Sequence, residues 1–150
     1  MKQYYERLAR TYLSSRGYSS DKIKEILTGF DLEKATYEQR LDQRTIIYQF
    51  VRRSSQSNIM PKLGNWFCLP GASQSRLAII GGGEGRQIAK IRVEVPLLAL
   101  EGTASPQSIN WDWSGGGEGG ATQIFIPDQY LMSNIRVLGY TTTFAHSAGA

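Results

Sequence analysis

The beginning of the chain repeats its hydrophobic positions with the period of an α-helix. Between Lys2 and Ser15, tyrosines and leucines recur three or four residues apart with basic residues between them, which is typical of an amphipathic helix. A glycine follows, and Ser19 or Ser20 is then placed to cap a second short helix that ends before Gly29. The pattern therefore predicts a helical hairpin in residues 1–30.

After Gly29 the period changes from helical to short alternating runs. A polar connection comes first, in residues 30–44, and β-branched or aromatic runs then alternate with Gly, Pro, Ser and Asn, the pattern of strands joined by turns. We expect strands at Ile46–Arg52, Trp66–Cys68, Ala89–Val95, Leu97–Leu100, Gln123–Ile126 and Ile135–Tyr140. Residues 73–80 fit one or two helical turns but contain no strong period. Helices followed by a mostly antiparallel sheet predict an α+β fold.

A chain of 150 residues fits one domain with a single core. We expect a helical part in residues 1–30, a β-rich core in residues 44–140 and a frayed tail in residues 141–150, where small and polar residues follow no period. Hydrophobic residues make up 41% of the chain and charged residues 20%, so the composition argues against wholesale disorder.

Charge and cysteine content narrow the classes of function. Lys and Arg outnumber Asp and Glu by 17 to 13 and the pI is near 9.3, which favours phosphate-bearing ligands without requiring them. Cys68 is the one cysteine, which excludes an intrachain disulfide and a cysteine-built metal site, and we expect no bound metal. No apolar run approaches the ~20 residues of a membrane span, and the first ten residues lack the apolar core of a secretory signal. We expect something else to carry the domain if it leaves its cell.

Two glycine clusters lie beside predicted strands, GGGEG at residues 81–85 and GGGEGG at residues 115–120. The second satisfies the dinucleotide pattern G-x-G-x-x-G, but a strand follows it instead of the helix that would meet a pyrophosphate. Neither cluster has the Lys and Ser or Thr of a P-loop. We interpret both as loops, the second crossing the mouth of a cleft before the strand that carries Gln123.

The sequence lacks the familiar catalytic constellations. His146 lies in the tail without a nearby acid or nucleophile, and Cys68 has no identified base, so hydrolase triads are set aside. The carboxylates of the sheet region show no spacing that singles out an acid and base pair. Three segments with aromatic, basic and amide residues remain, which are IYQFVRR at 47–53, GNWFCLPG at 64–71 and GGATQIFIP at 119–127.

These segments, in this order, resemble the type 46 polymorphic toxin domain of bacterial contact-dependent and Rhs effectors. The resemblance also includes the segment GYSSDKIKEILTGFDLEKA before them and VPLLALEGTASP between the last two. The resemblance implies a fold of the ADP-ribosyltransferase type, a split antiparallel β-sheet in which residues 44–140 form a cleft for NAD as co-substrate. It also implies a cognate immunity protein and a parent effector polypeptide that a specialised system secretes. Its place of action would be the cytoplasm of a competing bacterium.

NAD cleavage needs polar groups at the ribose, because the departing nicotinamide leaves an oxocarbenium-like sugar. Gln123 matches the last motif of the family, and the resemblance places it beside the ribose hydroxyls as a catalytic residue. Broader transferases usually carry a glutamate at this position. Glu118, on the neighbouring glycine loop, is the second catalytic candidate because it can supply the missing charge. Along the strand, we expect Gln123 and Phe125 on one side and Ile124 and Ile126 toward the core.

The remaining candidates would bind NAD. Arg52, with Arg53 or Arg76 as replacements, is expected to clamp the pyrophosphate with its guanidinium. Trp66 and Phe67 are expected to stack on the nicotinamide ring. The residues expected to bind NAD also include Tyr48, Gln49 and Gly64. Broader transferases often have Tyr-Arg where this chain has Tyr48-Gln49, and whether the position of Gln49 or Arg52 takes the role of that arginine stays open.

Three hypotheses of function follow. The first is a mono-ADP-ribosyltransferase toxin that modifies RNA or protein of a competing bacterium, and five basic residues near the N-terminus permit an RNA target: Arg7, Arg10, Arg16, Lys22 and Lys24. The second is an NAD glycohydrolase, which Gln123 favours. The third is an RNA-binding or nuclease domain, which ranks last because no single strand carries the aromatic and basic signature of an RNA-recognition sheet.

Overall fold

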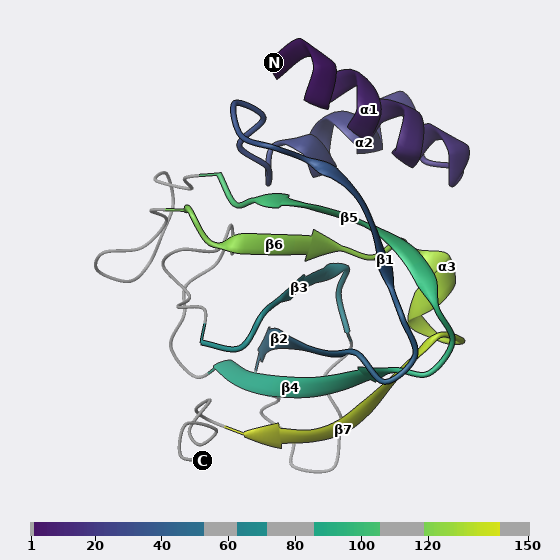
Figure 1. Ribbon diagram of the computed structural model, residues 1–150, viewed down its shortest axis with the longest axis vertical. Coiled ribbons are helices and arrows are strands. Elements are labelled where there is room, and N and C mark those ends of the chain that lie inside the picture. The colour runs from purple at the N-terminus through teal and green to yellow at the C-terminus, as the bar shows by residue number, and fades with distance from the viewer. Residues whose placement is uncertain (1, 53–62, 72–85, 106–118, 142–150) are drawn as a thin grey trace.

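The structure is a computed structural model that describes residues 2–52, 63–71, 86–105 and 119–141. Two helices precede a sheet, and a third short helix lies before the last strand (Figure 1). The elements are α1 (Lys2–Ser15), α2 (Ser20–Leu27), β1 (Tyr37–Leu41), β2 (Ile46–Arg52), β3 (Trp66–Cys68), β4 (Arg86–Val93), β5 (Leu97–Thr103), β6 (Thr122–Phe125), α3 (Asp128–Leu131) and β7 (Ile135–Thr141).

Both predicted helices and all six predicted strands are present, so the α+β class is confirmed. β1 was not predicted, because four of its five residues are polar or exposed and only Leu41 is buried. It moves the start of the β-rich part ahead of residue 44. The short helix α3 was also not predicted, since four residues are too few to show a helical period. The predicted turns at 73–80 and most of the predicted tail lie outside the described residues.

The strands form one antiparallel sheet in the order β1-β5-β6-β3-β2-β4-β7. Within the described residues, β2 and β3 share a single ladder pair, Tyr48 opposite Cys68, whereas β2 and β4 share seven pairs. The sheet therefore consists of two well-paired halves, β1-β5-β6-β3 and β2-β4-β7, that meet at one narrow junction. All seven strands nonetheless belong to a single sheet, and the split sheet of the ADP-ribosyltransferase type stays a prediction.

Two hydrophobic cores lie on opposite faces of the sheet. The first core fills the space between the two halves and includes Ile47, Phe67 and Ile124. The second core lies under the helical hairpin and includes Leu13 and Phe125. In Figure 1 the two helices cover the β5 and β6 end of the sheet and leave the β4 and β7 end uncovered by helix.

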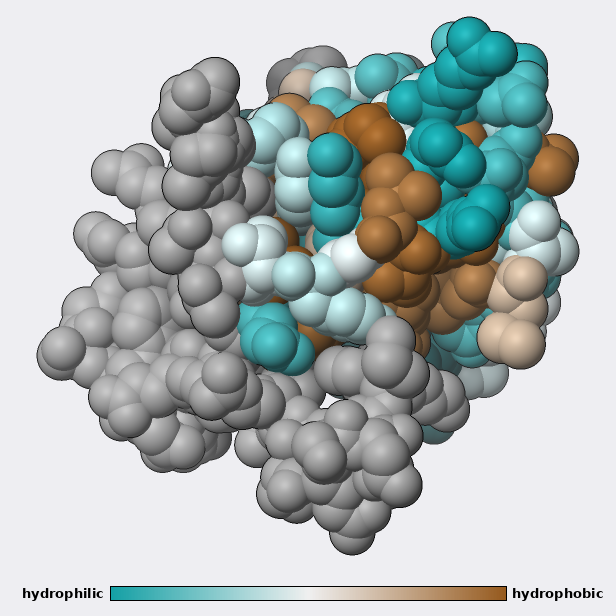
Figure 2. All heavy atoms as spheres, turned by 90° about the horizontal axis from the view of Figure 1, so that it is seen from below, coloured by the Kyte–Doolittle hydropathy of each residue, from teal (hydrophilic) through white to brown (hydrophobic). Residues whose placement is uncertain are grey.

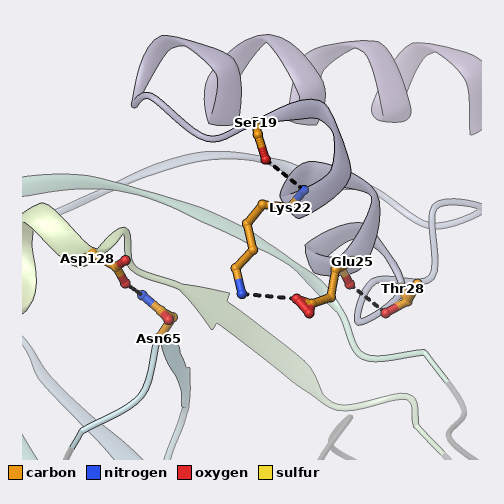
Figure 3. A network of polar contacts seen from close by, with 6 residues as sticks. All are labelled: Ser19, Lys22, Glu25, Thr28, Asn65 and Asp128. Atoms are coloured by element: carbon orange, nitrogen blue, oxygen red, sulfur yellow. Dashed lines mark hydrogen bonds and ion pairs between the residues drawn. The ribbon is translucent and has the colours of Figure 1, made fainter.

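Polar contacts fix the helical hairpin to the sheet. The Tyr12 hydroxyl donates to the carbonyl of Leu98 in β5 at 2.6 Å, and the Tyr18 hydroxyl accepts from the amide of Asp128 at 3.0 Å. The Asp128 carboxylate also accepts from the Asn65 amide at 2.6 Å, beside the Ser19 cap of α2 and the Lys22–Glu25 ion pair (Figure 3). These contacts join the hairpin, β3 and the end of β6 into one unit.

The close packing of the second core predicts the effect of filling Gly102. A Cβ at Gly102 would lie 2.8 Å from the Phe30 ring and 2.9 Å from the Thr36 hydroxyl, whereas a Cβ at Gly139, also in a strand, would meet nothing within 4 Å. Overpacking of a core costs about 1 to 3 kcal/mol. We expect Gly102→Ala to lower the free energy of unfolding by that amount in urea denaturation, with Gly139→Ala as the matched control. Equal stability of the two variants would contradict this packing.

Candidate functional site

The candidate catalytic residue Gln123 lies in a row of residues that crosses four strands. Gln123 in β6 is opposite Gly102 in β5 and Cys68 in β3, and Cys68 is opposite Tyr48 in β2. Opposite residues of antiparallel strands place their side chains on the same face. We name Gln123, Cys68 and Tyr48 the Gln123 row. It crosses the junction between the two halves of the sheet, so it brings together two of the predicted site residues, Gln123 and Tyr48.

Gln123 is more deeply buried than the sequence suggested. Its residue is 1% exposed. Alternation along β6 is as expected, since Ile124 and Ile126 belong to the first core, but Phe125 on the side of Gln123 belongs to the second core under the helices. The expectation of one free face is therefore corrected, because the helical hairpin covers that face at Phe125.

Gln49 holds β3 against β2. Its Nε2 donates to the carbonyls of Gly64 and Trp66, both at 2.9 Å, and its Oε1 accepts from the amide of Gly64 at 2.9 Å. The residue is 5% exposed, and both of its amide N–H groups are used. In this structure Gln49 and Gly64, which were expected to bind NAD, thus contact each other and strengthen the junction beside the single ladder pair.

The aromatic residues of β3 pack within the protein. Phe67 is 1% exposed and belongs to the first core. The Trp66 ring packs against Phe30 and Phe125, with both pairs of ring centroids 5.1 Å apart. Stacking on nicotinamide would require an accessible ring face. The structure instead gives Phe67 a role in the core and leaves Trp66 half-buried beneath the helical hairpin.

The charged candidates lie at strand ends or outside the described residues. Arg52 is the last residue of β2 and pairs with Arg86 in β4, and nothing further is described of its side chain. Arg53, Arg76 and Glu118 lie outside the described residues.

The thiol beside Gln123 is not set up for nucleophilic chemistry. Burial raises the pKa of Cys68 to about 12, so the thiol stays protonated at neutral pH. Among the described residues, no group of three or more His, Cys, Asp or Glu is arranged to hold a metal ion. The described helices also include none that is long and apolar enough to span a membrane. Besides this thiol, the Gln123 row contains the neutral amide of Gln123 and the phenol of Tyr48.

Two neighbours of Gln123, Gly102 and Cys68, were not identified as site residues from the sequence. Gly102 faces Gln123 across the ladder and makes room for Phe30 and Thr36. The signal for these neighbours is the strand order, which places β6 between β5 and β3 although β3 is distant in the chain. No local pattern encodes that order.

Comparison with solved structures shows the same fold in two other proteins. Tse6, solved in complex with Tsi6, superposes with a TM-score of 0.70 at 21% identity, covering 92% of this chain and 96% of that one. Rhs1-CT, in complex with its cognate immunity protein RhsI1, gives a TM-score of 0.50 at 19% identity, covering 77% of this chain and 84% of that one. No known family model matches the sequence, and neither does any curated protein.

The contacts of Gln49 predict a large loss of stability when its amide is removed. Gln49→Met keeps the length of the side chain but leaves the polar groups of Gly64 and Trp66 without these partners. Each buried polar group left unpaired costs about 1 to 3 kcal/mol. We expect a total loss of about 2 to 4 kcal/mol in urea denaturation. Gln39→Met, on the edge strand β1, is the control and should change stability by less than about 0.5 kcal/mol.

Proposed function

We propose that this chain is the toxin domain of an interbacterial effector and that a cognate immunity protein neutralises it. The observation that carries the proposal is the fold that it shares with Tse6 and Rhs1-CT, each solved in complex with a second protein that in the latter case is the cognate immunity protein. The net charge of +4 favours an acidic surface on the immunity protein. The parent effector, a specialised secretion system and action in the cytoplasm of the target cell belong to the same proposal.

For the activity, we propose that the chain breaks the bond between nicotinamide and ribose in NAD and transfers ADP-ribose to a macromolecule. The electron pair of the broken C–N bond goes to the pyridinium nitrogen, so neutral nicotinamide leaves. A nucleophilic oxygen of the acceptor then bonds to the ribose carbon and gives its proton to solvent. Support comes from the motif around Gln123 and from the ladder pairs, which put Gln123 and Tyr48 on the same face two strands apart.

In this proposal each residue of the site has a separate role. Gln123 positions the ribose through hydrogen bonds of its amide, and Tyr48 lies two strands away on the same face. Arg52, at the end of β2, clamps the pyrophosphate. Glu118 supplies negative charge to the developing cation. Because Gln123 is buried, NAD reaches it from the strand ends that lead into residues 72–85 and 106–118.

An NAD glycohydrolase is the second candidate, and the amide of Gln123 favours it. A neutral amide stabilises an oxocarbenium ion less well than the carboxylate that transferases usually carry at this position. The described residues of the Gln123 row contain no carboxylate. In a glycohydrolase, water takes the place of the acceptor oxygen and the product is free ADP-ribose.

Replacement of Gln123 tests the site. Gln123→Met retains most of the buried volume and removes the amide, so we expect NAD consumption to fall by about 100-fold or more while the fold persists. Arg52→Gln should give a similar loss if the guanidinium clamps the pyrophosphate. Gln129→Met, on the exposed face of α3, is the control and should keep the wild-type rate. Full NAD consumption by both site variants would show that the site lies elsewhere.

Labelled NAD separates the two activities. The chain is incubated with NAD labelled in the adenosine part and with a bacterial lysate. Label that becomes attached to RNA or protein identifies a transferase, and free labelled ADP-ribose without labelled acceptor identifies a glycohydrolase. Intact NAD in all samples would contradict both.

A further inference from the structure

The uncovered half of the sheet carries a basic face that continues the Gln123 row. Across β2, β4 and β7, Tyr48 is opposite Lys90, and Ile46 is opposite Arg92, which in turn is opposite Arg136. Partners in an antiparallel ladder share a face. We name Ile46, Tyr48, Lys90, Arg92 and Arg136 the basic sheet face.

The charge on this face is only partly neutralised. Lys90 and Arg136 are exposed and have no ion pair among the described residues. Arg92 pairs with Glu94 at 2.5 Å, and its side chain is still 37% exposed. Two of the three cations are thus left without a described counter-charge.

Arg92 and Arg136 face each other directly across the ladder. Like charges in directly opposite positions destabilise a sheet, so these two arginines lower the stability of the free protein. A bound polyanion removes that repulsion. Like charges in such destabilising positions are typical of functional surfaces.

The helical part of the chain shows a different pattern of charge. Arg10 pairs with Glu6 at 2.9 Å, and Lys22 pairs with Glu25 at 3.0 Å. The guanidinium of Arg16 lies 3.9 Å from the centre of the Tyr12 ring. Of the five basic residues near the N-terminus that suggested a phosphate-binding surface from the sequence, Arg10 and Lys22 are thus ion-paired within the helices. The sheet differs because its exposed cations come together from neighbouring strands, with Arg92 directly opposite Arg136.

Hydrophobic and basic groups occur together on this side of the molecule. Figure 2 views the protein from below, the side on which β4 and β7 lie in Figure 1, and shows a band of hydrophobic residues beside strongly hydrophilic ones. Tyr48 and Ile46 of the basic sheet face are half-buried. Aromatic rings beside cations are the groups that bind single-stranded nucleic acid, since the rings stack on bases and the cations meet phosphates. An acidic protein surface would match the charge but would give the Tyr48 ring no comparable role.

From these observations we propose that the basic sheet face binds single-stranded nucleic acid as the acceptor of ADP-ribose. The inference rests on the proposed transferase function. Three strand spacings separate Lys90 from Gln123 along the row, or about 14 Å. A strand held by Lys90 and Arg136 thus extends across Tyr48 toward the ribose at Gln123. One of its hydroxyl oxygens attacks the ribose carbon as nicotinamide leaves, and its proton passes to solvent.

Binding is tested with fluorescent 12-nucleotide pyrimidine strands, RNA and DNA, by polarisation between 50 and 200 mM KCl. We expect Lys90→Gln/Arg136→Gln to weaken binding about tenfold or more and to reduce the salt slope by about 1.4, since each charge contributes about 0.7 for single strands. Arg7→Gln/Lys24→Gln removes the same charge from exposed helix positions and should change affinity less than about twofold. Binding of the RNA strand supports the proposal, whereas binding of DNA alone contradicts it, because the internal nucleotides of DNA have no sugar hydroxyl to accept ADP-ribose.

The proposal is overturned if neither strand binds the wild-type chain, if the sheet variant binds as tightly as wild type, or if the helix variant loses as much affinity. Label from NAD that appears only on protein also overturns it. NAD consumption by the wild-type chain is measured separately, with a bacterial lysate present as the source of acceptor. If the wild-type chain consumes no NAD, the proposed function fails, whereas the polarisation data still decide whether the basic sheet face binds nucleic acid.

Discussion

The two halves of the sheet meet at the pair of Tyr48 and Cys68, and the arrangement of the site depends on this contact. Within the described residues this is the one ladder pair between β2 and β3, so it supplies few hydrogen bonds to hold the two halves of the sheet together. Gln49 provides three more, from one side chain, to the backbone of Gly64 and Trp66. A side-chain amide can bridge a widening gap that backbone groups of neighbouring strands no longer span. The junction therefore stays intact where the sheet splits.

The same junction explains why a polar residue is buried at Gln123. β6 lies between β5 and β3 and carries hydrophobic residues on both faces, with Ile124 in the first core and Phe125 in the second. A strand covered on both faces has few positions for a polar side chain without loss of stability. Gln123 is such a position, near the end of the strand and next to the row that crosses the junction.

The helices and most strands could be predicted from the sequence, whereas the pairing of strands with one another could not. The limits of β2 and β3 were predicted because strong strand formers stand between polar or glycine-rich stretches. β1 was missed because an edge strand needs no alternation, and only Leu41 of its residues reaches the core. Trp66 and Phe67 looked like a stacking surface between two glycines, but β3 is an inner strand, so its aromatic rings fill the two cores instead. Strand order, which decides these outcomes, has no local signal in the chain.

The basic sheet face is a second feature that could not be predicted from the sequence. The groups of the basic sheet face come from three strands, with Tyr48 in β2, Lys90 and Arg92 in β4, and Arg136 in β7. The register assembles the pattern only after folding. Since Gln123 belongs to one half of the sheet and Lys90 to the other, the junction at Tyr48 and Cys68 fixes the distance between the proposed NAD site and the basic sheet face. In the proposed enzyme, the hydrogen bonds of Gln49 to Gly64 and Trp66 thus help to set the geometry of transfer.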